Sequence, residues 1–117
     1  MTALGRLEGE SFCYLTTTGR VSGNPHEIEI WFASKDATIY MLAGGRDASD
    51  WVRNIRAIPD VSMRIAGETF SGRARVVSDT AEDAWAREAL VSKYSKTSEE
   101  LERWGRTALP VAVDLDV

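Results

Sequence analysis

Side chains and backbone groups suited to holding an anion gather in one segment, TTTGRVSGNP. Gly19 and Gly23 permit backbone conformations that align N–H groups into a concave nest. Arg20 offers a planar fork for a phosphate, and Ser22 adds a hydroxyl donor. His26, the single histidine of the chain, follows directly. Taken alone, the segment is also compatible with a solvated turn, because turns are rich in these residues.

A second segment, AGGRDASDW, has similar character. Gly44 and Gly45 follow an apolar run, Arg46 adds a positive charge, and a helix start is expected next. A strand, a glycine-rich turn and a helix N-terminus together are typical of anion-binding sites. A plain strand-to-helix connection with a solvated arginine is the alternative.

Side chains that would carry out covalent or metal chemistry are scarce. One histidine and one cysteine cannot form a structural zinc site, and no nucleophile-elbow or Ser-His-Asp pattern is present. An enzyme of this composition is therefore expected to use the chemistry of a bound cofactor. Tyr94, near the end of an expected helix, is the candidate for a proton donor or a substrate contact.

These segments are positioned by short strands with helices between them. Alternation of apolar residues predicts strands, and helical spacing of apolar residues predicts helices. Thr80 with Asp83, and Thr97 with Glu100, have the spacing of capping boxes. Gly72 within a strand indicates a bend or a close approach. The expected strands cover residues 11–17, 26–34, 38–43, 61–65 and 70–76 (a hairpin), and 109–117. The first expected helix begins at Asp47 or Ser49 and ends near residue 58. Two further helices are expected over about 81–94 and 98–105.

The fold predicted from this order is mainly β with helices (α+β), in one domain covering residues 1–117. Short, mostly antiparallel strands suggest a small barrel of about six strands with three or four packed helices. The chain of 117 residues is long enough to bury an ordinary core.

Composition excludes several classes of function. A net charge of −4 argues against nucleic-acid binding, which would need a basic face. The longest apolar runs are too short for an integral membrane segment, and the first residues lack the pattern of a signal peptide. With Cys13 as the only cysteine, a reducing, cytoplasmic location is expected.

Three stretches resemble the deazaflavin-dependent nitroreductase family: YLTTTGRVSGNPHEIEIWF, LAGGRDASDWVRNIRAIPDVSMRIAGETFSGRARVV and RTALPVAVDL. The similarity covers roughly residues 12–115. The family belongs to the split-β-barrel flavin and deazaflavin superfamily, which includes the pyridoxamine phosphate oxidases. The resemblance implies a split β-barrel, coenzyme F420 as cofactor, and hydride transfer to a small organic acceptor such as an enone, a quinone or a nitro compound. The cofactor-binding residues it implies are Thr18, Gly19, Arg20, Val21, Ser22, Gly23, His26, Ile28, Ile30, Ala43, Gly44, Gly45, Arg46, Trp51 and Asn54.

The sequence departs from the family pattern at three positions that are often basic. Val21, Ala43 and His26 stand where lysine or arginine is usual. FMN therefore stays open as an alternative cofactor, and a protein that binds a cofactor or another anionic ligand without turnover stays open as an alternative function. The resemblance also allows a homodimer, in which Trp31, on the polar face of its strand, would suit a subunit contact or a second packing layer.

Overall fold

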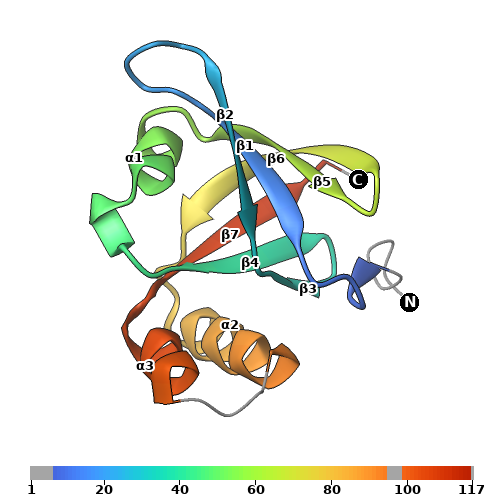
Figure 1. Ribbon diagram of the computed structural model, residues 1–117, viewed down its shortest axis with the longest axis vertical. Helices are drawn as coiled ribbons and strands as arrows, with labels where there is room; N and C mark the ends of the chain where they lie inside the picture. The colour runs from blue at the N-terminus through green and yellow to red at the C-terminus, as the bar shows by residue number, and fades with distance from the viewer. Residues whose placement is uncertain (1–6, 95–98, 117) are drawn as a thin grey trace.

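The computed structural model describes residues 7–94 and 99–116, and its strands form one curled antiparallel sheet (Figure 1). The order across the sheet is β2-β1-β5-β6-β7-β4-β3, so β2 and β3 lie at its two edges. The described strands are β1 (Cys13–Thr18), β2 (Pro25–Ile30), β3 (Ala33–Lys35), β4 (Thr38–Ala43), β5 (Asp60–Ile65), β6 (Glu68–Val76) and β7 (Leu109–Leu115). The described helices are α1 (Asp50–Ala57), α2 (Thr80–Lys93) and α3 (Glu99–Thr107), with a short 3-10 turn, η2 (Arg46–Ala48), before α1. This arrangement is the expected α+β split barrel.

The β5–β6 hairpin shows how local sequence sets the register. Its turn residues, Ala66 and Gly67, have φ angles of 53° and 81°, the left-handed pair that a two-residue hairpin turn requires. Gly72 in β6 confirms the expected close approach, since a Cβ there would lie 2.8 Å from Val113 Cγ1 and 2.9 Å from the Asp114 carbonyl oxygen. The glycine thus lets β6 and β7 pack without a gap.

The single strand expected over residues 26–34 is wrong, because the chain changes partners in the middle of it. Ile30 pairs with Cys13 of β1, whereas Ala33 pairs with Tyr40 of β4. At the break, the Phe32 backbone N–H donates to the Tyr94 hydroxyl at 3.0 Å instead of to a strand. The apolar alternation continues through the break, so the sequence pattern did not reveal it.

Both faces of the sheet bury apolar residues. One cluster fills the inside of the curled sheet, where Phe32, Leu15 and Met63 are fully buried, and α1 packs against it through Val52. The second cluster lies between the sheet and α2, and includes Leu90. Strands β4 and β7 contribute alternate residues to each cluster, which explains their almost continuous apolar sequences.

Helix α2 begins with a different cap from the predicted one. Asp79, not Thr80, is the N-cap, and its side chain accepts a hydrogen bond from the Glu82 backbone N–H at 2.8 Å. Aspartate is preferred over threonine as an N-cap, so the helix begins one residue earlier than the cap predicted at Thr80 would allow. The cap predicted at Thr97 lies outside the described residues.

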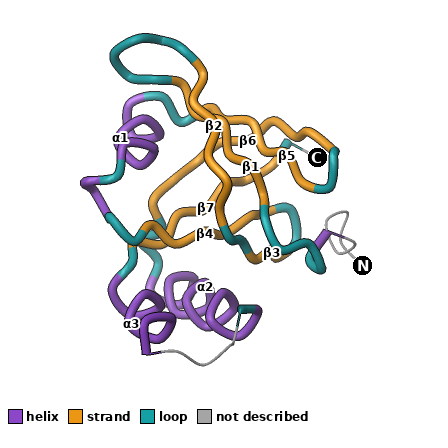
Figure 2. The backbone as a smooth tube through the Cα atoms, in the orientation of Figure 1, coloured by secondary structure: helices purple, strands orange, loops and turns teal. Residues whose placement is uncertain are grey.

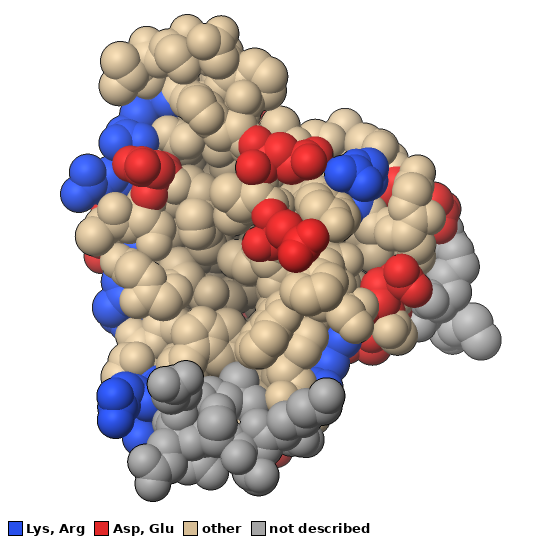
Figure 3. All heavy atoms as spheres, in the orientation of Figure 1, with Lys and Arg blue, Asp and Glu red and all other residues tan. Residues whose placement is uncertain are grey.

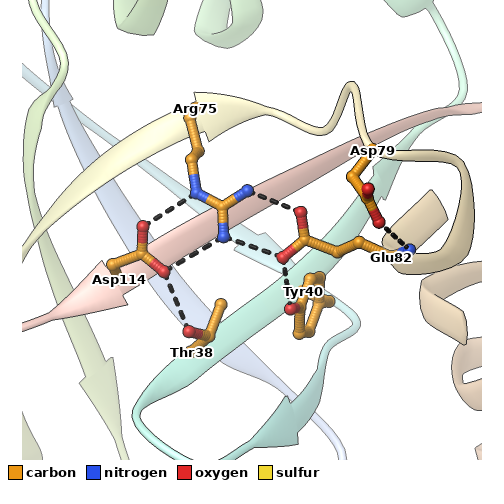
Figure 4. A network of polar contacts seen from close by, with 6 residues as sticks. All are labelled: Thr38, Tyr40, Arg75, Asp79, Glu82 and Asp114. Carbon is orange, nitrogen blue, oxygen red and sulfur yellow. Dashed lines mark hydrogen bonds and ion pairs between the residues drawn. The ribbon is translucent and has the colours of Figure 1, made fainter.

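A polar network ties α2 to the sheet (Figure 4). Arg75 of β6 donates to both carboxylate oxygens of Glu82, at 2.6 and 2.8 Å, and to Asp114 of β7, at 2.8 and 3.2 Å. The Tyr40 hydroxyl donates to Glu82 at 2.6 Å, and the Thr38 hydroxyl donates to Asp114 at 2.8 Å.

Over the described residues, no helix has the length and apolar character needed to cross a membrane.

Candidate functional site

The loop between β1 and β2, residues 19–24, is closed by its own backbone. The Gly19 N–H donates to the Asn24 carbonyl oxygen at 2.8 Å, and the Gly23 N–H donates to the Gly19 carbonyl oxygen at 2.8 Å. Gly23 has a φ of 74°, a conformation in which a side chain would be strained. Figure 2 shows this loop extending beyond the sheet on the same side as α1.

The missing side chain of Gly19 brings two polar side chains together. A Cβ on this residue would lie 2.7 Å from His26 Nε2 and 2.7 Å from Ser22 Oγ. The Ser22 oxygen accepts the Asn24 N–H at 3.1 Å, which leaves its hydroxyl hydrogen able to donate outward. Gly19 therefore allows an imidazole and a hydroxyl to converge beside the loop backbone.

Arg20 is held against α1 by a buried amide. Asn54 Oδ1 accepts from the Arg20 backbone N–H at 3.2 Å and from its Nη1 at 2.8 Å. On its other side, Asn54 Nδ2 donates to Thr17 Oγ1 at 3.1 Å. Asn54 and Thr17 are only 4% and 1% exposed. The amide thus joins the end of β1, the loop and α1 in one hydrogen-bonded unit.

These residues line a cleft of about 650 Å³, a typical volume for a small-molecule site. Figure 3 shows that this face of the molecule is hollowed, with acidic side chains exposed beside the hollow. Charged and polar groups are mixed with apolar walls. The lining residues are Thr17, Gly19, Arg20, Val21, Ser22, Pro25, His26, Glu27, Ile28, Asp50, Trp51 and Asn54.

The cleft gathers eight of the predicted site residues but not the rest. Those that line it are Gly19, Arg20, Val21, Ser22, His26, Ile28, Trp51 and Asn54. Thr18, Gly23 and Ile30 belong to the same loop and strands without lining it, and Ala43 is buried in the core. The lining also includes Thr17, Pro25, Glu27 and Asp50, which sequence reasoning did not select.

The glycine-rich turn before α1 is not part of this cleft. A Cβ on Gly45 would lie 2.5 Å from Ser49 Oγ, so this glycine lets the turn pack against the start of α1. Arg46, with a φ of 50°, directs its guanidinium to the Thr107 carbonyl oxygen at the end of α3. Gly44 lies against the Trp104 ring. The two arginine-containing loops, although similar in sequence, have different neighbours in space.

Tyr94 is held by backbone groups. Its hydroxyl donates to the Ser11 carbonyl oxygen at 2.7 Å, with the Phe32 carbonyl oxygen at 3.1 Å, and accepts the Phe32 N–H. Burial raises the pKa of Tyr94 to about 12. A hydroxyl with these contacts is poorly placed to release a proton to a substrate.

The Tyr94 ring belongs to an aromatic group with Trp31 and Trp104. It stacks on Trp31 with ring centroids 4.4 Å apart, and Trp104 meets Trp31 edge to face at 5.6 Å. Trp31 therefore forms part of a second packing layer within the chain, one of the two roles expected for it.

Comparisons with known proteins agree with this architecture. The F420H(2)-dependent quinone reductase family matches residues 2–116. No curated protein matched the chain. Among solved structures, the conserved hypothetical protein Rv2991 from Mycobacterium tuberculosis has a TM-score of 0.79 at 19% identity, over 100% of this chain and 82% of that one.

Two further solved structures share the fold. An F420-H2 dependent reductase, FDR-A, has a TM-score of 0.69 at 24% identity, over 88% of this chain and 93% of that one. An FAD-binding protein from Mesorhizobium loti has a TM-score of 0.72 at 18% identity, over 100% of this chain and 91% of that one. Because the family match spans nearly the whole chain, the protein belongs to the F420H2-dependent quinone reductase family, as an oxidoreductase whose cofactor is coenzyme F420.

Proposed function

We propose that the protein passes a hydride from reduced F420 to a small organic acceptor, such as a quinone, an enone or a nitro compound. The observation that supports this most directly is the convergence of Arg20, Ser22 and His26 on one cleft of about 650 Å³. An arginine fork and a hydroxyl donor are the groups that hold a phosphate, and the cofactor carries one.

The donor set of the cleft fits a ligand with one phosphate and a flat apolar part. Arg20, Ser22 and His26 would hold the phosphate, while Ile28 and Trp51 offer apolar surface to the rest. Two carboxylates, Glu27 and Asp50, also line the cleft, and each is paired with an arginine: Glu27 with Arg64 at 3.3 Å and Asp50 with Arg20 at 3.4 Å. When bound, reduced F420 supplies the two electrons as a hydride.

In this proposal the chain contributes binding, orientation and exclusion of water. Asn54 fixes the direction of Arg20, and the loop fixes Ser22 and His26. The proton that completes the reduction of the acceptor would come from solvent water and not from a side chain of the cleft.

The partly exposed aromatic group of Trp31 and Trp104 is the proposed contact for the acceptor. Flat indole surfaces suit a planar quinone or nitroarene, because aromatic rings stack with offset faces. Ile28 lines the cleft from β2, and Trp31 follows the end of the same strand.

The test begins with cofactor retention. Purified protein is mixed with F420 or with FMN, desalted, and examined by absorption spectroscopy. Retention of F420 is expected; retention of FMN alone would transfer the proposal to FMN, and retention of neither would refute it. The F420-loaded, reduced protein is then given a quinone, an enone and a nitro compound in separate reactions. Oxidation of the cofactor by at least one acceptor is expected, whereas retention without oxidation would favour a non-catalytic binding protein.

A further inference from the structure

Arg20 contacts two residues that lie four positions apart on α1. Residues at this spacing share one face of a helix, so Asp50 and Asn54 approach the guanidinium together. Asn54 accepts from Nη1 at 2.8 Å. Asp50 accepts from Nη1 through its carbonyl oxygen and from Nη2 through its carboxylate, both at 3.4 Å.

The two contacts differ in strength. The Asn54 side chain is buried, and all the described contacts of its amide are short enough to be ordinary hydrogen bonds. The Asp50 side chain is 87% exposed, and 3.4 Å is well beyond the 2.7–2.9 Å usual for a charge-assisted bond. The first contact is fixed, and the second is loose and easily replaced.

A carboxylate and a phosphate use the same edge of a guanidinium. We propose that Asp50 is an internal competitor for the phosphate, which takes the place of the Asp50 carboxylate on Arg20 when it binds, while Asn54 keeps Arg20 in position. This inference rests on the proposed role of Arg20 as the phosphate ligand. Asp50 would then set the affinity of the cleft for an anion without touching the bound cofactor, and Asn54 would be a positioning residue.

Replacement of Asp50 by Asn tests the competitor. The amide keeps the size of the side chain but removes the charge that pairs with Arg20. We expect Asp50→Asn to tighten the binding of F420 by about two- to fivefold at low ionic strength, the scale of the one exposed ion pair with Arg20 that binding must displace. The gain should shrink at high salt. Binding is measured by fluorescence titration of F420, and independently by titration of inorganic phosphate followed through the NMR signal of the Arg20 backbone amide.

Glu27→Gln is the matched control. Glu27 lines the same cleft, but its carboxylate pairs with Arg64 at 3.3 Å and not with Arg20. The substitution removes the same charge from the cleft and should change affinity by less than about twofold. Equal gains from Asp50→Asn and Glu27→Gln would mean that only the overall charge matters, and would overturn the proposal.

A double-mutant cycle separates a role through Arg20 from a general structural role. In an Arg20→Gln background, Asp50→Asn should bring no gain, and Asn54→Leu should cost no further affinity for phosphate. A gain that persists without Arg20 would refute competition, and an Asn54→Leu loss that persists would assign Asn54 a purely structural role. If the wild type binds phosphate but not F420, the proposed function fails while competition remains testable. If it binds neither, both fail.

Discussion

At the scale of single residues, the site depends on Gly19 having no side chain as much as on the polar side chains around it. Gly19 leaves room for His26 and Ser22, whose polar atoms would lie 2.7 Å from a Cβ at this position. Both are ends of side chains that can turn away, so extra bulk here should displace them rather than break the fold.

We therefore predict that Gly19→Ala weakens F420 binding by about tenfold or more but lowers the free energy of unfolding by only about 1 kcal/mol. Gly9→Ala is the control, because a Cβ at Gly9 has nothing within 4 Å. Fluorescence titration and urea unfolding give the two quantities. Unchanged affinity in Gly19→Ala would show that the positions of His26 and Ser22 do not matter for binding.

Arg20 should carry most of the phosphate affinity. We predict that Arg20→Ala costs about 1–3 kcal/mol of F420 binding energy, the usual strength of a charge-assisted pair. Arg53→Ala is the control. It also removes one positive charge, but Arg53 lies on α1, donates to the Asp47 carbonyl oxygen and does not line the cleft. Titration of both variants should show a large loss only for Arg20→Ala; equal losses would indicate general electrostatic attraction.

Only part of the cleft could be predicted from the sequence. The loop of residues 19–24 was found because glycine, arginine and serine are close together in the chain. The sequence does not predict Asp50 and Thr17 as cleft residues, since their place there depends on the packing of α1 against β1. Two spacings indicate them: Asp50 lies four residues before Asn54, on the same helix face, and Thr17 lies just before the loop. Arg46 shows the opposite case: the same residue type after a similar turn is directed to Thr107.

At the scale of elements, periodicity predicted strands and helices well but not their exact ends. The alternation from Ile28 to Phe32 is uninterrupted, yet β2 ends at Ile30 because the next residues must reach β4. Such a change of partner is a tertiary event that local pattern does not record. The N-cap of α2 is Asp79 and not the predicted Thr80 for a simpler reason: the two residues are neighbours, and both are of types that cap helices.

The network around Arg75 should make stability depend on pH. Hydrogen bonds from Arg75 are the main cause that lowers the pKa of Glu82 below its ordinary value of 4.5, and that of Asp114 below 3.8. A lowered folded pKa stabilises the protein above the unfolded pKa, and this contribution is lost as pH falls through the folded pKa. We predict that Arg75→Met costs about 1–2 kcal/mol at pH 7, a modest value because Arg75 and Asp114 are 42% and 50% exposed.

The destabilisation by Arg75→Met should shrink as pH falls below about 4, because the two carboxylates are protonated first in the unfolded chain and, at still lower pH, in the folded protein. Urea unfolding from pH 7 to pH 3 measures it. Arg56→Met is the control, since the Arg56–Asp47 ion pair is exposed and separate from the network, and it should cost less than about 0.5 kcal/mol. A destabilisation by Arg75→Met that is constant over this pH range would contradict an electrostatic origin.

At the scale of the whole molecule, the N-terminal segment, the sheet edge and α2 meet at a few polar contacts. Glu8 accepts from the Ser34 backbone N–H at 2.7 Å and pairs with Lys93 at 3.6 Å. Tyr94 joins the same three regions through Ser11 and Phe32. These contacts hold the connection between β2 and β3, which lie at the two edges of the sheet, so they support the strand that carries the cleft at its other end.

Tyr94 is thus expected to support the fold rather than the reaction. We predict that Tyr94→Phe lowers the free energy of unfolding by about 1–2 kcal/mol, because the Phe32 N–H and the Ser11 carbonyl oxygen lose their partner. The kcat for a quinone acceptor should stay within about twofold, since burial raises the pKa of Tyr94 to about 12 and its proton is already donated to a backbone oxygen. Tyr14→Phe removes an exposed hydroxyl bonded to Glu29 and should alter stability by less than about 0.5 kcal/mol. Thermal unfolding and single-turnover kinetics separate the two roles: a tenfold loss of rate at unchanged stability would instead make Tyr94 the proton donor.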